Sequence, residues 1–219
     1  MVSLKDIKQD EEIKALIKQG NDNLGLLGFT DHSSIHCEVV VKQSAQILRK
    51  LGYDKETIEL AKIASYMHDI GNAINRKKHA EYGGILANEI LKRYDISTPN
   101  RIRIASAISN HDESTGGAID PISAALIIAD KTDVRRDRVR DKTKGNFDIH
   151  DRVNYAVTKS NLTVDKEKKT ITLDLELDEK ICTMLEYFDI FLGRMMMCRR
   201  AAELLGYKFK QKANGDKIQ

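Results

Sequence analysis

The chain has 219 residues, 41% hydrophobic and 32% charged, values typical of a globular protein with its own core. Its net charge is +3, and segment 208–219 alone carries four lysines against one aspartate, so the rest of the chain is nearly neutral. A neutral body argues against nucleic acid as the main partner, because binding phosphate backbones requires a basic surface. No segment approaches the roughly 20 apolar residues of a membrane helix, so we expect no membrane partner.

The three cysteines, Cys37, Cys182 and Cys198, are far apart and form no C-x-x-C pair. Residues 1–10 show no secretory signal pattern. Together these features predict a reduced protein located in the cytoplasm.

Helical periodicity dominates residues 4–157, and capping residues mark the expected helix ends. A short N-terminal helix should stop before the Gly- and Asn-rich segment 20–28. Gly52 ends the next helix, and Asp54 caps the one after it. Thr98-Pro99 and Asp120-Pro121 each place a capping side chain before a proline at the first helical position. The expected helices span 4–17, 36–51, 55–67, 79–94, 98–111, 121 to beyond 133, and, capped by Asp148, a short helix through Val157.

Residues 162–177 break the helical pattern. Thr170 to Leu177 alternates apolar and polar residues, and Leu162 and Val164 supply a partner strand across the turn 165–169, which predicts a hairpin packed by one face. Asp178 should then begin a long helix, whose expected inward residues are Ile181, Leu185, Phe188, Leu192 and Met195. The prediction is a mostly α fold, one compact helical domain over 1–207 with a small β-hairpin insertion, followed by a disordered basic tail at 208–219.

Five metal-competent side chains lie at the ends of predicted helices, in register with the apolar stripe of each helix. They are His36, His68, His79, His111 and Asp130. Burying several such groups without partners would exhaust the roughly 5–15 kcal/mol by which a typical fold is stable, so they need each other or a cation. Imidazoles with carboxylates suit Mn, Fe, Co, Ni or Zn, and the lack of cysteine pairs argues against a structural zinc site.

The segment Tyr66-Met67-His68-Asp69-Ile70-Gly71, with His36 upstream and Asp130 downstream, resembles the HD superfamily of metal-dependent phosphohydrolases. The resemblance covers roughly residues 30–140, the expected metal-site core. It implies an all-helical fold, hydrolysis of phosphate esters or anhydrides, and divalent metal bound by His36, His68, Asp69 and Asp130. Members with two metals carry further histidines, which His79 and His111 resemble, and we favour two metals over one.

The resemblance also implies roles for individual residues. Asp69 and His68 would be catalytic, with Asp69 between two cations that activate a water molecule. Lys131, Arg135 and Arg138 share one face if the helix continues past Asp133, and this face would bind a substrate phosphate; a solvated, internally paired helix is the alternative. The other expected substrate contacts are Lys78, His32 and Asp112. Two questions stay open at this point: whether His32 or His36 is the first ligand, and whether Asp112 is itself a ligand.

The leading hypothesis is a metal-dependent phosphohydrolase acting on a small phosphorylated molecule, with a nucleotide favoured. One alternative is a di-iron oxygenase of the same fold, since helical proteins that resemble this family oxidise their substrates with oxygen. Another is a non-catalytic nucleotide-binding or dimerising module. The complete ligand set argues against the third hypothesis. The sequence contains no motif for a particular base, and it leaves a homodimer open.

Overall fold

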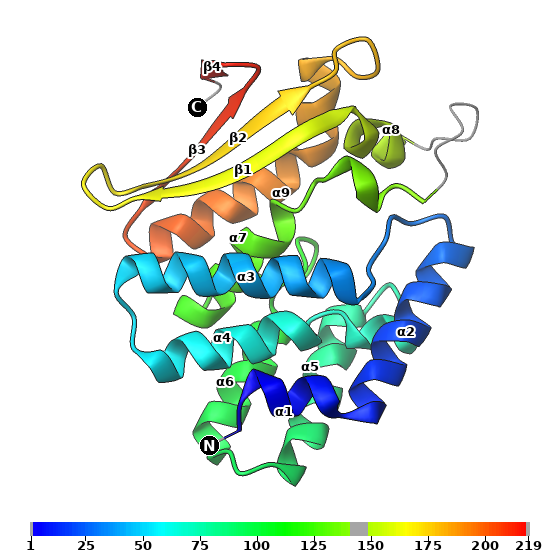
Figure 1. Cartoon of the computed structure of the whole chain (residues 1–219), viewed down its shortest axis with the longest axis vertical. Helices are drawn as coiled ribbons and strands as arrows, with labels where there is room; N and C mark the ends of the chain where they lie inside the picture. Colours follow the sequence, from blue (N-terminus) through cyan, green and yellow to red (C-terminus); the bar gives the residue numbers. More distant parts are fainter. Residues whose placement is uncertain (1, 141–148, 218–219) are drawn as a thin grey trace.

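A computed structural model describes residues 2–140 and 149–217 of the chain. The fold is mostly α-helical, with a small β-sheet near the C-terminus, as the sequence predicts (Figure 1). None of the helices in the described residues has the length and apolarity needed to cross a bilayer. The α-helices are α1 (Leu4–Gln9), α2 (Glu11–Leu26), α3 (Ser34–Leu51), α4 (Lys55–Met67), α5 (His79–Ile90), α6 (Thr98–Ser109), α7 (Pro121–Lys131), α8 (Ile149–Ala156) and α9 (Met184–Leu204).

Most helix ends follow the local signals in the sequence. Gly52 ends α3 in the left-handed conformation (φ 88°), which glycine adopts without steric cost. Asp54 caps α4 by accepting a hydrogen bond from the backbone N–H of Thr57. Asp120 caps α7, whose first residue is a proline. In α6 the capping residue is Ser97 rather than Thr98. The expected cap of α8, Asp148, lies outside the described residues.

The N-terminal region differs from the prediction. Asp10 ends α1 and its side chain caps a second helix, so two helices replace the single one expected. The expected loop at 20–28 is wrong, because α2 continues through it to Leu26. Gly20 lies where a Cβ would come within 3.1 Å of Asn72 and Ala73. This glycine therefore serves close packing between α2 and the 3₁₀ turn Ile70–Ala73, not a loop.

The helices pack around the segments that carry the predicted ligands. α3 contacts both α4 and α7, α5 contacts α6, and α7 contacts α9. One cluster of buried apolar side chains extends from Val2 to Ala213 and includes the apolar stripes of these helices. The packing fixes the ends of α3 to α7 relative to one another.

The predicted hairpin is present and belongs to a larger sheet. β1 (Val157–Asp165) pairs antiparallel with β2 (Thr170–Leu177), and Val164 lies opposite Ile171 as the alternation requires. The expectation of a disordered tail at 208–219 is wrong for its described part. There β3 (Lys208–Ala213) pairs parallel with β2, and β4 (Asp216–Lys217) pairs antiparallel with β3. In Lys208–Ala213 buried residues, among them Phe209 and Ala213, alternate with exposed or half-buried lysines, and this weak signal was present in the sequence.

The long helix α9 connects β2 to β3 and lies against one face of the sheet (Figure 1). It begins at Met184 after the capping residue Thr183, not at Asp178. The expected inward face is also partly wrong, because Leu185 is 80% exposed and Leu192 is 55% exposed. Met195 is buried as expected, and the other buried residues of α9 are Tyr187, Phe191, Met197, Cys198, Ala201 and Ala202. Since α9 carries two apolar stripes, contact with α7 and β3 decides which of them is buried.

Candidate active site

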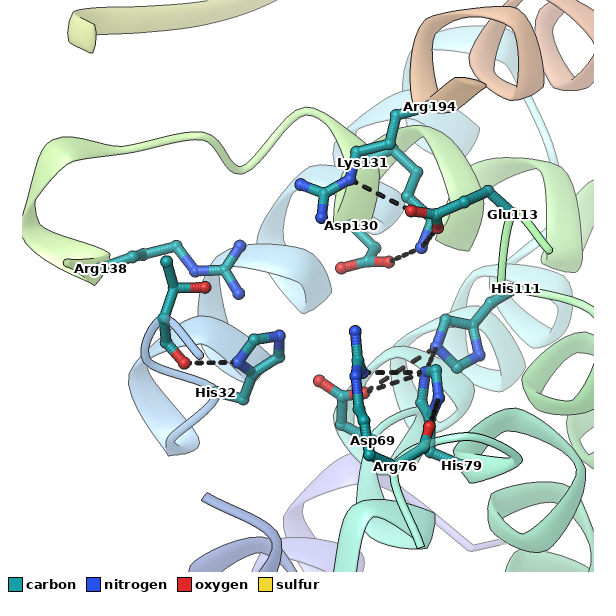
Figure 2. A pocket seen from close by; sticks show the side chains of 11 residues that line it. His32, Asp69, Arg76, His79, His111, Glu113, Asp130, Lys131, Arg138 and Arg194 are labelled. Carbon is teal, nitrogen blue, oxygen red and sulfur yellow. Dashed lines mark hydrogen bonds and ion pairs between the residues drawn. The ribbon is translucent and has the colours of Figure 1, made fainter. Parts of the chain in front are cut away.

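A polar cavity opens where the ends of α3, α4, α5, α6 and α7 meet (Figure 2). His36 lies in the first turn of α3, His68 directly follows α4, and His79 begins α5. His111 follows α6, and Asp130 lies in the last turn of α7. The cavity is lined by Thr30, His32, Asp69, Arg76, His79, His111, Glu113, Asp130, Lys131, Arg138 and Arg194. The structure therefore brings together all six residues expected to bind metal.

A glycine holds the His68-Asp69 segment close to α5. A Cβ on Gly71 would overlap the carbonyl oxygen of His79 and lie 2.6 Å from the backbone nitrogen of Gly83. Only glycine permits this approach of the 3₁₀ turn to α5. The position of Gly71 after His68-Asp69 thus has a physical reason, because it brings His79 beside Asp69.

The four buried imidazoles share one orientation. Each donates its Nδ1–H to a fixed acceptor, which leaves Nε2 unprotonated in the neutral ring and turned toward the cluster. This arrangement is common for imidazoles that bind metals, since the second ring nitrogen fixes the orientation of the ligand atom. The acceptors are Asp133 Oδ2 for His36 at 2.7 Å, Ser65 O for His68 at 2.8 Å, Arg76 O for His79 at 3.0 Å and Ile108 O for His111 at 2.6 Å.

The first histidine pair is surrounded by carboxylates. The Nε2 atoms of His36 and His68 lie 3.3 Å apart, and Asp130 Oδ1 lies 3.2 Å from His36 Nε2 and 3.6 Å from His68 Nε2. Asp69 Oδ2 lies 3.2 Å from His68 Nε2. Burial disfavours protonation of His68, but the two carboxylates outweigh it and raise the pKa of His68 to about 10. This pair therefore requires a positive charge, either a proton or a metal ion.

The second pair has the same spacing, but neither ring carries a second proton. The Nε2 atoms of His79 and His111 lie 3.2 Å apart. Burial lowers the pKa of His79 below its usual value and that of His111 to about 3, so both rings are neutral near pH 7. Two nitrogen lone pairs then face each other in a buried site, an arrangement that a cation between them would stabilise.

Asp69 lies between the two pairs and directs one oxygen toward each. Oδ2 faces His36 and His68, while Oδ1 lies 3.7 Å from His79 Nε2 and 3.9 Å from His111 Nε2. Asp69 Oδ2 is buried and accepts no hydrogen bond from any described residue. Although burial opposes ionisation, the facing imidazoles hold the pKa of Asp69 well below its usual range. An ionised, unsatisfied oxygen beside imidazole nitrogens fits a divalent cation.

Donor atoms close enough to share a metal ion form two overlapping groups. His36, His68 and Asp130 make up one group, and His68, Asp69 and His111 make up the other. His32 and His79 belong to neither group; His79 Nε2 lies 3.2 Å from His111 Nε2, whereas the Nδ1 of His32 contacts the carbonyl oxygen of Thr30 at 2.7 Å. This geometry favours His36 over His32 as the first ligand.

Lys131 compensates the charge of Asp130. Its buried Nζ lies 2.9 Å from Asp130 Oδ2 and 2.6 Å from Glu113 Oε2. Despite burial, these carboxylates raise the pKa of Lys131 above its usual value. Lys131 is thus a permanent cation in the cavity wall, as expected of a phosphate contact.

The other expected substrate contacts lie in different places. Arg138 and His32 line the cavity. The helical face predicted to join Lys131, Arg135 and Arg138 is wrong, because α7 ends at Lys131. Arg135 instead pairs with Asp133 and Asp137.

Lys78 and Asp112 are also absent from the cavity lining. Lys78 is exposed. Asp112 lies beside the site, with Oδ2 3.7 Å from His79 Nε2, but its Oδ1 accepts a hydrogen bond from Ser114.

Four functional candidates were missed by sequence reasoning. Arg76, Glu113 and Arg194 line the cavity, and Asp133 accepts the Nδ1–H of His36. Asp133 lies three residues after Asp130, a spacing that offered a signal. Nothing in the local sequence marks Arg194, which lies more than 60 residues from Asp130 along the chain.

Comparison with known proteins agrees with the arrangement of these ligands. A family model described as the HD domain matches residues 34–159, more than half of the chain. The chain belongs to the HD superfamily of metal-dependent phosphohydrolases. Membership implies binding of divalent metal, and the histidine and aspartate groups of this HD-domain protein have the chemistry to provide it.

A relative of this HD-domain protein is the uncharacterized protein MJ1020 of Methanocaldococcus jannaschii. The two are 26% identical over 169 residues, which cover 66% of this chain and 64% of the relative. The chain thus spans less than two thirds of the length of the curated relative that it matches, and the name of that relative indicates no substrate.

Proposed function

We propose that this HD-domain protein hydrolyses a phosphoester or phosphoanhydride bond of a small phosphorylated molecule, and that the substrate is a nucleotide. The observation that carries the proposal is the position of Asp69 between two histidine pairs, with one carboxylate oxygen toward each. Such a carboxylate is suited to hold two cations side by side, the arrangement used to stabilise both the attacking and the leaving oxygen in phosphoryl transfer.

Six residues would hold the metal ions. In this proposal His36, His68 and Asp130 would hold one cation, His79 and His111 the other, and Asp69 both, which the short distances between their donor atoms support. Divalent metal bound there would supply Lewis acidity, which acidifies water and polarises a phosphoryl oxygen.

The remaining residues of the site position these ligands and the substrate. Asp133 accepts the Nδ1–H of His36 and so directs its Nε2 toward Asp130. Lys131 and Arg138 present cationic groups to the cavity, where phosphate oxygens would accept their hydrogen bonds. These fixed cations would stabilise the charge that spreads over the equatorial oxygens in the transition state.

Metal analysis and a substrate screen test the proposal together. The purified protein should contain, or take up, close to two equivalents of Mn, Fe, Co, Ni or Zn. Each loaded form is then assayed for phosphate release from nucleotides and from non-nucleotide phosphoesters, in air and without oxygen. Phosphate release that is independent of oxygen supports the proposal. Folded protein that binds no metal contradicts it, and turnover that requires iron and oxygen would indicate an oxygenase.

A further inference from the structure

Three arginine side chains converge on the cavity from separate parts of the chain. Arg76 follows the 3₁₀ turn Ile70–Ala73, Arg138 lies in the turn Arg136–Arg138, and Arg194 lies in α9. Figure 2 shows their guanidinium groups directed from different sides toward the space beside Asp69 and Asp130. Arg194 lies outside the segment 34–159 that matches the family model, so α9 adds it to the cavity from beyond that segment.

Contacts of the Nε atom and of the guanidinium plane hold the Arg194 side chain in place. Nε donates to Glu113 Oε1 at 3.2 Å, and the guanidinium lies over the ring of Phe191, 4.6 Å from its centroid. In Figure 2 the two terminal nitrogens lie on the cavity side of this anchor. No described residue accepts a hydrogen bond from them, so the donor pair that suits a phosphate group remains available.

With divalent metal bound, the net charge of the cavity would exceed what a phosphomonoester neutralises. Four cationic side chains (Arg76, Lys131, Arg138 and Arg194) and three carboxylates (Asp69, Glu113 and Asp130) leave an excess of one positive charge. One divalent cation would bring the excess to three charges and two cations to five. A phosphomonoester carries about −2 at neutral pH and a terminal diphosphate about −3, so a monoester leaves positive charge uncompensated in both cases.

The carboxylates expected to bind metal and the arginines lie on different sides of the cavity. Asp69 and Asp130 mark the metal side, where the reacting phosphoryl group would lie. Arg138 and Arg194 face the cavity from two other sides (Figure 2). Lys131 is already shared between Asp130 and Glu113. Arg138 donates from Nε to Asp31 O and from one terminal nitrogen to Asp133 O, and Arg76 donates from one terminal nitrogen to Asn72 Oδ1. Arg194, with both terminal nitrogens available, therefore provides the main free donors for a second anionic group.

We infer that Arg194, together with Arg138 and Arg76, binds a second phosphate group, so that the substrate carries a diphosphate. This inference rests on the proposed hydrolase function. In the reaction a bond forms between a water oxygen and the phosphorus on the metal side, and the bridging P–O bond breaks. Its electron pair leaves with the second phosphate, whose developing charge the arginines stabilise. One proton of the water stays on a product phosphate and the other is released to solvent.

The kinetic test compares R194Q with a matched control on the same helix. Arg199 is exposed, pairs with Glu203 at 3.1 Å and does not line the cavity, so R199Q removes an equal charge elsewhere. Metal-loaded wild type and variants are assayed with a nucleoside diphosphate, inorganic diphosphate and a nucleoside monophosphate. We expect R194Q to lower kcat/KM about 30-fold for substrates with a diphosphate and less than about threefold for the monophosphate, with R199Q unchanged. Equal losses on all substrates would overturn the inference.

A binding measurement separates this inference from the hydrolase proposal. Methylene diphosphonate, which cannot be hydrolysed at its P–C–P linkage, and inorganic phosphate are titrated calorimetrically into metal-loaded wild type, R194Q and R194K. The diphosphonate should bind more tightly than phosphate, and R194Q should weaken only the diphosphonate, by about tenfold.

R194K keeps the charge but not the paired donors, and it should fall between wild type and R194Q. If R194Q weakens only diphosphonate binding and no phosphate compound is hydrolysed, the hydrolase proposal is contradicted and the diphosphate site is retained. If a phosphate compound is hydrolysed but the diphosphonate and phosphate bind equally tightly, only the diphosphate site is contradicted.

Discussion

The His36–His68 pair and the His79–His111 pair present their Nε2 atoms to each other at 3.3 Å and 3.2 Å, and each contacts one oxygen of Asp69. Their surroundings differ, because Asp130 lies against the first pair only. Asp69 and the additional carboxylate of Asp130 together raise the pKa of His68 to about 10, whereas burial lowers that of His111 to about 3. The two pairs therefore have equal spacing, but in the absence of metal only the first holds an additional proton. The charge of the surrounding carboxylates causes this difference.

The largest effect is expected at Asp69, the residue that the two pairs share. Asp69→Ala should reduce hydrolysis by about 10³-fold, equivalent to about 4 kcal/mol, because both cations lose a ligand. Metal content should fall, while helical content by circular dichroism stays close to wild type. Asp69→Asn keeps the volume and removes only the charge, and it should show a comparable loss. More than a tenth of the wild-type rate in Asp69→Ala would contradict the assigned role.

Replacement of the His79–His111 pair tests how much metal and activity the His36–His68 pair supports alone. The double variant His79→Ala, His111→Ala should bind about one equivalent of metal less and lose on the order of 10²-fold in rate. Metal analysis after gel filtration measures the stoichiometry. His150→Ala, a change at an exposed histidine outside the cavity, is the control. Unchanged metal content with a modest rate loss would show that one metal suffices.

A smaller effect is expected where only the orientation of a ligand changes. Asp133→Asn removes the charge that accepts the Nδ1–H of His36, and metal affinity at the first pair should fall about tenfold. Asp137→Asn is the matched control, because Asp137 also pairs with Arg135 but does not contact His36. Competition with a fluorescent chelator measures the affinities. Equal effects of the two variants would mean that Asp133 acts only through Arg135.

The smallest change per step is expected in the pH dependence, where the two pairs of the unaltered protein should differ. Below pH 10, metal entering the first pair must displace the proton of His68, so its affinity should rise about tenfold per pH unit between pH 7 and 9. The second pair is already neutral in this range, so its affinity should be nearly constant. Calorimetry in buffers of different ionisation enthalpy should detect about one proton released for the first cation. If the affinities for both cations changed equally with pH, the proposed difference in protonation between the two pairs would be wrong.

Much of the candidate site was predictable because its ligands depend on local helix structure. His36, His68, His79, His111 and Asp130 each continue an apolar stripe to a helix end, and burial of the stripe carries the polar residue inward. The caps and glycines at these ends are equally local. For this reason local patterns alone predict these five residues as ligands, and their ligation of metal stays a prediction.

The long helix α9 shows where this reasoning fails. Two apolar stripes run along it, and the sequence favoured the one that contains Leu185 and Leu192, but these two residues are exposed. The buried stripe contains Phe191, and the same side of the helix carries Arg194 to the cavity. Periodicity defines which residues share a face, but not which face another element covers.

By itself, the sequence determined most helices of this HD-domain protein, the hairpin and five of the six residues expected to bind metal, because caps, turns and periodicity act over a few neighbouring residues. The sixth, Asp69, is implied by the resemblance of its segment to the HD superfamily. Tertiary structure alone decided the rest. Pairing of β3 with β2, the contact of Asp133 with His36 and the position of Arg194 beside Glu113 each join segments more than 30 residues apart. Such contacts follow from the packing of whole elements around one core, and no local pattern encodes their partners.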